Sequence, residues 1–326
     1  MNNHIVRSSK EIGLVSLQLD LSIIIPIFNE VQSIQRLHSE IVQVCDREGY
    51  NYEIIIVDDG STDGTRDVLK KLTPLTNIRL RRNFGQTAAT DCGIKHAKGD
   101  LIVTMDGDGQ NDPADIPRLI KHLRENDFDV VSGWRKHRKD SISKKFMSRV
   151  ANVIRHFILD DGLHDSGCAL KVYKSECFKG ISLYGETHRF IPAILEIKGF
   201  RVGEIEVKHR SRSGGKTKYN WKRAIKGLID MISVWFWHRY AVRPLHLLGG
   251  VGGLCILAGL VVAVIGTVFY FTGIQLFRFF LPTFSSLLLI SGIQVFLFGL
   301  IGDILSRNYF ATSPDAPYSV EEIVEE

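Results

Sequence analysis

Acidic and amide side chains gather in three short segments of this sequence, and each segment directly follows a run of apolar, mostly β-branched residues. The segments are PIFNE (26–30), DDGSTDGT (58–65) and DGDGQ (106–110). In a parallel sheet, ligands bind at the edge formed by the carboxyl ends of the strands. Carboxylates that meet at one edge repel one another, so a cation or hydrogen-bond donors must accompany them. The pattern therefore predicts one polar site built from three strand ends.

The pair Asp106 and Asp108 is the candidate cation site. Gly107 and Gly109 let the backbone bend sharply after the apolar run at 101–105. Carboxylates of this kind suit Mg²⁺ or Mn²⁺, and Mg²⁺ keeps several waters and bridges to substrate phosphates. A single Asp-Gly pair is otherwise typical of a turn, which is the alternative for each pair taken alone.

Basic side chains gather in two other segments. Residues 135–149 contain seven Lys and Arg against one Asp. The second segment contains Arg212, Lys216 and Lys218. Both are candidates for binding anionic groups, and the alternative for most of the first segment is a solvated basic face or attraction to anionic lipid.

Two other nucleotide-binding patterns are excluded. The first apolar run is followed by PIFNE instead of the G-x-G-x-x-G of a dinucleotide-binding fold. The segment GGKT (214–217) resembles the end of a phosphate-binding loop, but the first glycine of that motif would fall at Arg210.

Apolar runs and helical stretches alternate through the first 220 residues. Strands are predicted at 21–27, 52–57, 78–82 and 101–105, and helices follow them, ending near Cys45 in the first case and covering 65–72, 87–97 and 116–125 in the others. Continuous apolar strands followed by helices indicate an α/β protein whose parallel sheet is covered on both faces.

The last third of the chain carries two long uncharged runs. Residues 244–277 and 279–302 contain no Asp, Glu, Lys or Arg, and each run exceeds the about 20 residues that span a bilayer. We predict two transmembrane helices that form a hairpin, with buried core helices as the alternative. Residues 221–240 have apolar residues at helical spacing between basic flanks, which predicts a helix in the headgroup layer; packing on the soluble domain is the alternative.

The flanking charges predict the orientation. Residues 201–243 contain eleven Lys and Arg against three acids, whereas the connection between the two runs carries only Arg278. The bias of positive charge toward the cytoplasm predicts a multi-pass inner-membrane protein with both termini cytoplasmic. The first twenty residues lack the apolar core of a signal peptide, and five widely spaced cysteines fit reduced cytosolic thiols.

Together, PIFNE, VDDGSTDGT, NFGQTAAT, LIVTMDGDGQ, GCALKVYK and HRSRSGGKTKY resemble the polyprenyl-phosphate glycosyltransferases. These are bacterial relatives of dolichyl-phosphate mannose synthase within the inverting glycosyltransferase family 2. The H-x-x-R-x-x-G-x-[ST]-K-Y run and the membrane hairpin narrow the likeness to this branch. The resemblance implies a GT-A fold, a Rossmann-like and mostly parallel sheet flanked by helices. The implied organisation is an N-terminal extension (1–20), a cytoplasmic catalytic domain (21–220), an interfacial amphipathic helix region (221–243), two transmembrane helices (244–303) and a cytoplasmic acidic tail (304–326).

The resemblance also implies the reaction, transfer of one sugar from a nucleotide sugar to undecaprenyl or another polyprenyl phosphate with inversion. UDP-glucose is the favoured donor, because the motifs look closest to bacterial enzymes that prepare glucosyl carriers for surface-polysaccharide modification. UDP-GlcNAc, GDP-mannose and a 4-amino-4-deoxyarabinose donor are the alternatives. The acceptor phosphate is ionised at neutral pH, so the enzyme must supply positioning and cations more than a strong base.

Family positions imply a role for individual residues. The implied donor-binding residues are Pro26, Phe28, Glu30, Asp58, Asp91, Asp106, Arg212 and Lys216. The implied metal ligands are Asp106, Asp108 and Gln110, and the implied acceptor-phosphate residues are Arg135, Lys144 and Ser148. The implied catalytic residues are Asp108, Asp165, Arg135 and Lys218. Phe28 replaces a tyrosine often found in the family, and Asp165 orients the acceptor or a sugar hydroxyl or makes a structural hydrogen bond. His188 and Arg189 also match family positions, without an assigned role.

Two rival functions remain at the level of the sequence. A processive polysaccharide synthase would usually carry Q-x-x-R-W, and no Arg-Trp pair occurs in the chain. A non-catalytic membrane scaffold would not need the intact acidic segments. We expect the bilayer but no nucleic acid among the partners. We also expect a homo-oligomer, because glycines such as Gly249, Gly252, Gly253 and Gly259 allow close contacts between helices.

Overall fold

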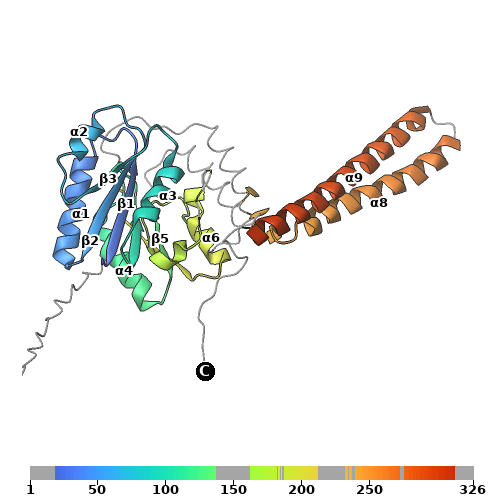
Figure 1. The fold of residues 1–326 in the computed structure, drawn as a ribbon. Coiled ribbons are helices and arrows are strands. Elements are labelled where there is room, and N and C mark those ends of the chain that lie inside the picture. The colour runs from blue at the N-terminus through green and yellow to red at the C-terminus, as the bar shows by residue number, and fades with distance from the viewer. Residues whose placement is uncertain are drawn as a thin grey trace, which may run out of the picture.

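The computed structural model describes residues 19–136, 162–211 except 182, 184 and 186, 232–271 except 234, 237 and 238, and 275–312. Within these residues, an α/β unit is followed by two long helices that extend away from it (Figure 1).

The α/β unit is built on a mostly parallel sheet, as the sequence predicts. Its described strands are β1 (Leu21–Ile27), β2 (Tyr52–Asp58), β3 (Thr76–Arg79), β4 (Leu101–Thr104), β5 (Val130–Trp134), β6 (Lys171–Lys174) and β7 (Val202–Glu206). Their order is β3-β2-β1-β4-β6-β5-β7, and β6 runs antiparallel to both of its neighbours. Ile27 lies opposite Asp58, and Ile24 lies opposite Thr104, so β1, β2 and β4 end at the same edge.

The predicted strands agree with the structure to within two or three residues. Three of them are confirmed almost residue for residue, and the one expected at 78–82 lies at Thr76–Arg79. The sequence pattern did not indicate β5, β6 or β7. These strands are short, and polar residues or glycine interrupt their apolar character, as in KVYK and VSGW. Their place in the sheet depends on tertiary pairing.

Helices cover both faces of the sheet (Figure 1). Helices α1 (Ile34–Glu48) and α4 (Ile116–Glu125) pack on the face that carries Ile23 and Ile25, whereas α3 (Gln86–His96) and α6 (Ile191–Ile197) pack on the face that carries Ile24. Because both faces are buried, β1 is apolar along almost its whole length. The short elements are α2 (Thr65–Leu69) and three 3₁₀ turns, η1 (Pro113–Asp115), η2 (Ser175–Phe178) and η3 (Thr187–Arg189).

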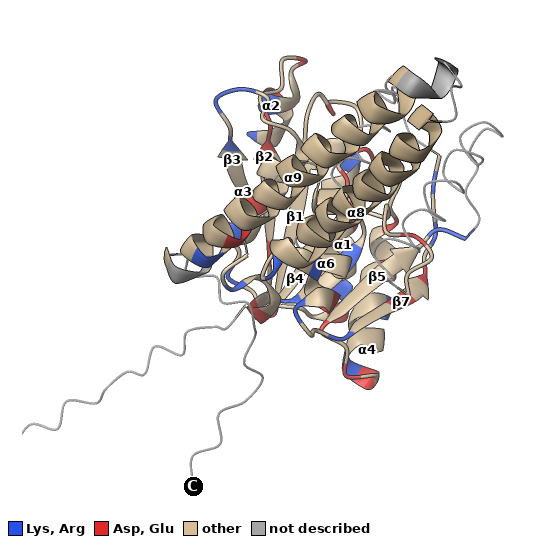
Figure 2. Ribbon diagram, turned by 90° about the vertical axis from the view of Figure 1, so that its right-hand side faces the viewer, with Lys and Arg blue, Asp and Glu red and all other residues tan. Residues whose placement is uncertain are grey.

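The two uncharged runs form helices α8 (Pro244–Phe271) and α9 (Gln275–Thr312), which pack against each other as a hairpin. Both are long and apolar enough to cross a bilayer. Their large apolar side chains are mostly exposed, with Phe271 82% and Phe279 77% exposed, so the alternative of buried core helices is wrong. Figure 2 shows the hairpin almost free of charged residues except near the end of α9.

Glycines bring the two helices of the hairpin into close contact. A Cβ atom on Gly252 would lie 2.7 Å from the Gly292 carbonyl oxygen, and one on Gly259 would lie 2.9 Å from the Leu289 side chain. These two glycines therefore serve packing within one chain. Gly253 faces open space, and association into an oligomer stays a prediction.

The segment that precedes the hairpin contacts the α/β unit. Trp235, in the segment expected at the membrane surface, packs against Phe190, which precedes α6, and against Ala193 within it. Ser306 donates a hydrogen bond to the carbonyl of Ala241, so α9 continues as a packed helix beyond residue 303. This end of the predicted interfacial helix contacts the α/β unit, as the alternative for that segment proposed. The headgroup position of the rest stays a prediction.

Candidate active site

The ends of β1 and β2 are tied together by hydrogen bonds. Asn29, which has a positive φ of 58°, donates its backbone N–H to Ser61 Oγ at 2.9 Å and accepts the Thr62 N–H on its side chain at 2.8 Å. The Glu30 N–H donates to Thr65 Oγ1 at 3.1 Å. The PIFNE and DDGSTDGT segments therefore form one surface, as the sequence predicts.

Asp58 lies fully buried at the end of β2. Its Oδ1 accepts the Ser61 N–H at 2.8 Å, and its Oδ2 pairs with Arg66 Nε at 2.8 Å. A buried carboxylate is expensive unless it is paired, and Arg66 of α2 supplies the pairing charge. Asp58 therefore has a defined orientation at the predicted nucleoside site.

The DGDGQ segment joins the same edge. Ser33 Oγ donates to the Gly107 carbonyl at 2.8 Å and lies 3.1 Å from Glu30 Oε2, which connects the first and third polar segments. Gly107 also packs closely against β1, because a Cβ atom at this position would lie 2.4 Å from Ile27 Cγ2. The predicted convergence of three strand ends is confirmed.

The carboxylate pair at this edge carries an electrostatic cost. Asp106 is half-buried, and burial together with the charge of Asp108 raises its pKa to about 6, against the opposing effects of Arg135 and Lys171. A cation beside the pair would favour the ionised form of both side chains. No group of three or more His, Cys, Asp or Glu side chains suited to a metal occurs in the described part of the chain. Two carboxylates suit Mg²⁺ or Mn²⁺ if waters and diphosphate oxygens complete the coordination.

Gln110 lies next to this pair, but its side chain turns toward a later segment. Its backbone N–H donates to Asp108 Oδ1 at 3.0 Å, and its Nε2 lies 3.5 Å from His209 Nε2. Its role as a metal ligand stays a prediction.

A relay of hydrogen bonds that the sequence did not reveal orients Asp106. Asp59, buried beside Asp58, accepts the backbone N–H groups of Phe84 and Gly85 at 2.7 and 2.9 Å. These bonds hold the start of α3, where Gln86 donates from Nε2 to Asp106 Oδ1 at 2.7 Å. The available signal was a second aspartate in DDGST and an amide directly after the glycine of NFGQ.

We expect Gln86→Leu to weaken cation use, because Asp106 would lose the donor that orients it. Residues that orient metal ligands typically contribute about tenfold to hundredfold in metal affinity or activity. The measurement is the Mn²⁺ concentration at which half of the purified protein has bound the ion. The control is Gln35→Leu, which changes an exposed glutamine of α1; the same Mn²⁺ requirement in both variants would contradict the positioning role.

Arg135 and Asp165 form a bidentate ion pair. Arg135 Nε lies 2.7 Å from Asp165 Oδ2, and Arg135 Nη2 lies 2.9 Å from Oδ1, with both side chains about nine-tenths buried. Two backbone N–H groups, of His164 and Asp165, donate to the Glu204 carboxylate at 2.9 Å each. The structure thus brings together two predicted site residues, but each uses much of its bonding capacity on the other. The acceptor-phosphate role of Arg135 stays a prediction.

A buried lysine lies close to this pair and was not singled out from the sequence. Lys171 begins β6 opposite Thr104 and is only 2% exposed. Its Nζ donates to the Ser166 carbonyl at 3.1 Å, and no carboxylate among the described residues forms an ion pair with it. Burial lowers its pKa to about 8, against opposing effects that include the charge of Asp165. The signal was a lysine between apolar residues in GCALKVYK.

Some of the other predicted residues lie within the described part of the chain, and five lie outside it. Asp91 pairs with Lys95 at 2.6 Å and accepts the Leu183 N–H at 2.9 Å, so its nucleoside role stays a prediction. His188 Nδ1 lies 2.7 Å from Thr87 Oγ1, beside Gln86, which gives this histidine a structural contact at the start of α3. Pro26 and Phe28 lie at and just after the end of β1, where the prediction placed them. Five predicted residues lie outside the described part of the chain: Lys144, Ser148, Arg212, Lys216 and Lys218.

Comparison with known proteins first identifies the class. The family described as "Glycosyl transferase family 2" matches residues 22–181, and together with the relatives that follow it shows that the protein is a glycosyltransferase. Two curated relatives cover nearly the whole chain. Dodecaprenyl-phosphate galacturonate synthase of Rhizobium johnstonii is 38% identical over 94% of both chains. Undecaprenyl-phosphate 4-deoxy-4-formamido-L-arabinose transferase of Aeromonas hydrophila is 32% identical over 93% of this chain and 94% of the relative. The chain belongs to the polyprenyl-phosphate glycosyltransferases of family 2.

Solved structures support the GT-A fold. Mannosyl-3-phosphoglycerate synthase from Rubrobacter xylanophilus matches with a TM-score of 0.56 at 16% identity, over 67% of this chain and 74% of that one. Glucosyl-3-phosphoglycerate synthase from Mycobacterium tuberculosis, in complex with Mn²⁺ and UDP-glucose, matches with a TM-score of 0.52 at 16% identity, over 67% of this chain and 79% of that one.

Proposed function

We propose that this membrane protein transfers one sugar from a nucleotide sugar to the phosphate of undecaprenol or a similar polyprenol, with inversion. The observation that carries the proposal is the convergence of PIFNE, DDGSTDGT and DGDGQ at one sheet edge, in a chain that continues into an apolar hairpin. The named relatives act on polyprenyl phosphates of this kind.

The residues at the edge divide the work of the reaction. Asp58 and the neighbouring β1 segment would bind the nucleoside, and Asp106 and Asp108 would hold Mg²⁺ or Mn²⁺. When bound, the cation supplies positive charge for the leaving nucleoside diphosphate. Gln86 orients Asp106 before substrate arrives. Groups that are held in place in advance stabilise the charge that develops in a transition state more than groups that must first reorient.

The acceptor side of the proposal rests on Arg135 and Lys171. Both positive charges lie near Asp106 and Asp165, so this region contains two cations and two carboxylates. An incoming phosphate is an anion, and these cations would reduce its repulsion from the donor diphosphate. The phosphate needs little activation, since it is ionised at neutral pH.

We propose that the donor sugar is one of those named for the relatives or one of those predicted from the sequence. A screen of the corresponding nucleotide sugars identifies it. Galacturonate and formamidoarabinose occur in the names of relatives. Glucose, the preference from the sequence motifs, has no support from these two names and remains in the screen. We also propose an inner-membrane location with the catalytic domain on the cytoplasmic side, which the basic flank of the hairpin supports.

The test is transfer of radiolabel from nucleotide sugars to undecaprenyl phosphate in membranes that contain the full chain. We expect lipid-phase label with one donor, loss of that label with EDTA, and recovery with added Mn²⁺ or Mg²⁺. Membranes without the protein serve as the control. An absence of label with every donor would favour the non-catalytic scaffold.

A further inference from the structure

A segment after β7 runs beside the DGDGQ segment (106–110), which we call the metal-binding loop. Asn111 and His209 form an antiparallel bridge, and the Arg210 N–H donates to the Gln110 carbonyl at 2.9 Å. The Lys208 N–H donates to Asp115 Oδ2 at 2.7 Å. Two segments about a hundred residues apart in sequence therefore lie side by side, directly after Asp108.

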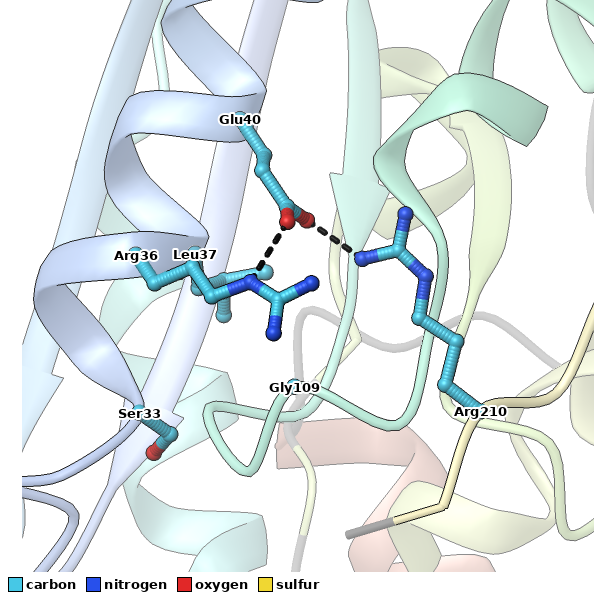
Figure 3. A pocket seen from close by; sticks show the side chains of 6 residues that line it. All are labelled: Ser33, Arg36, Leu37, Glu40, Gly109 and Arg210. Atoms are coloured by element: carbon cyan, nitrogen blue, oxygen red, sulfur yellow. Dashed lines mark hydrogen bonds and ion pairs between the residues drawn. The ribbon is translucent and has the colours of Figure 1, made fainter. Parts of the chain in front are cut away.

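The side chain of Arg210 strengthens this contact. Its Nη2 lies 2.7 Å from Asp112 Oδ1, and its Nη1 lies 2.5 Å from Glu40 Oε2 on α1. Figure 3 shows Arg210 reaching across toward Glu40, with Gly109 of the metal-binding loop below the Glu40 carboxylate. Asp112 also accepts the Ala114 N–H at 3.0 Å, which caps the 3₁₀ turn η1 that follows the loop.

One guanidinium thus connects three parts of the fold: α1, the residues that follow Asp108, and the segment after β7. Glu40 also pairs with Arg36 at 2.8 Å, but that bond stays within one helix and Arg36 is 67% exposed. An exposed pair of this type contributes little. A planar fork with five N–H donors can bond two carboxylates at once, whereas the compact ammonium of lysine does so poorly.

We propose that Arg210 is a positioning residue that holds the metal-binding loop in its cation-binding geometry. This inference rests on the proposed function of Asp106 and Asp108. It assigns to Arg210 an effect on cation affinity that reaches the cation only through the backbone of 108–112.

Charge and positioning predict opposite effects for the loss of Arg210. Removing a positive charge near two carboxylates would by itself strengthen cation binding. Loss of positioning would weaken it, because the ligands would no longer be held in place. The direction of the change therefore separates the two roles.

The experiment measures binding of Mn²⁺ alone to the purified full chain in detergent, from the electron paramagnetic resonance signal of free Mn²⁺. We expect Arg210→Met to raise the Kd about tenfold, the lower end for residues that orient ligands. We expect Arg210→Lys to lie between this variant and the wild type. The matched control is Arg36→Met, which removes the other partner of Glu40 and should leave the Kd unchanged.

Thermal unfolding of all variants shows that they are folded before binding is compared. An unchanged or lowered Kd in Arg210→Met would overturn the positioning role and leave the proposed reaction intact. An equal rise in Arg36→Met would overturn it as well, since the effect would then belong to Glu40 and its helix. Absence of Mn²⁺ binding by the wild type would overturn the role of Arg210, and sugar transfer that persists in EDTA would overturn the proposed metal site as well.

Discussion

Asp108→Ala is expected to abolish sugar transfer while leaving the protein folded and inserted in the membrane. Asp108 follows β4 at the shared edge. Its negative charge lies close enough to Asp106 to raise the pKa of that carboxyl group. Charge stabilisation by a bound cation contributes several kcal/mol to such reactions, and each 1.4 kcal/mol is about tenfold in rate. We therefore expect a loss of about a thousandfold or more in kcat. The measurement is lipid-linked product formed per minute at saturating donor, acceptor and Mn²⁺.

Two further variants make this result specific. Asp108→Asn keeps the shape of the side chain and its bond to the Gln110 N–H but removes the charge, so we expect nearly the same loss. Asp67→Ala changes an exposed aspartate of α2 and should keep wild-type activity. Near-normal turnover in Asp108→Ala would show that the metal assignment is wrong.

The second large effect is expected from breaking the pair between Arg135 and Asp165. Arg135→Ala leaves the Asp165 carboxylate nine-tenths buried without its bidentate partner. Removing one member of a buried ion pair typically costs about 3–5 kcal/mol of stability. We expect a clear fall in the unfolding temperature and a loss of transfer, measured by thermal unfolding and by the labelled-lipid assay.

A conservative and a double variant separate stability from the acceptor role. Arg135→Lys keeps the charge, and we expect its KM for polyprenyl phosphate to rise more than its KM for the nucleotide sugar. Replacing Arg135 by Met and Asp165 by Leu together removes both buried charges, which often restores stability. We expect this double variant to regain stability but not transfer. Recovery of transfer with stability, or equal changes in both KM values, would remove Arg135 from the acceptor site.

Local pattern was sufficient for most of the fold's first half and for the hairpin. The strands at Leu21–Ile27 and Tyr52–Asp58 are apolar along nearly their whole length, because both faces of the sheet are covered. The hairpin helices follow from length and composition alone. The strands β5, β6 and β7 could not be found in this way. Lys171 and Lys174 at the two ends of β6 are tolerated only because tertiary contacts serve them.

The site divides along the same line. The three acidic segments were identifiable because each follows an apolar run, and parallel pairing brings such ends together. Their supporting contacts were not identifiable. Gln86 reaches Asp106 across 20 positions in sequence, Arg135 reaches Asp165 across 30, and Arg210 reaches Glu40 across 170.

The sequence by itself determined which residues are acidic at strand ends and which runs are apolar enough for a membrane. Its motifs also carry the family resemblance that implies the class of reaction. These properties are local, because burial of a strand and solubility of a helix in lipid depend on the residues within it. The tertiary structure alone decided the long-range partners of the charged groups at the site. Side-chain pairing over long sequence distances depends on strand order and on the reversed direction of β6. That direction brings Lys171 close enough to feel the charges of Asp106, Arg135 and Asp165.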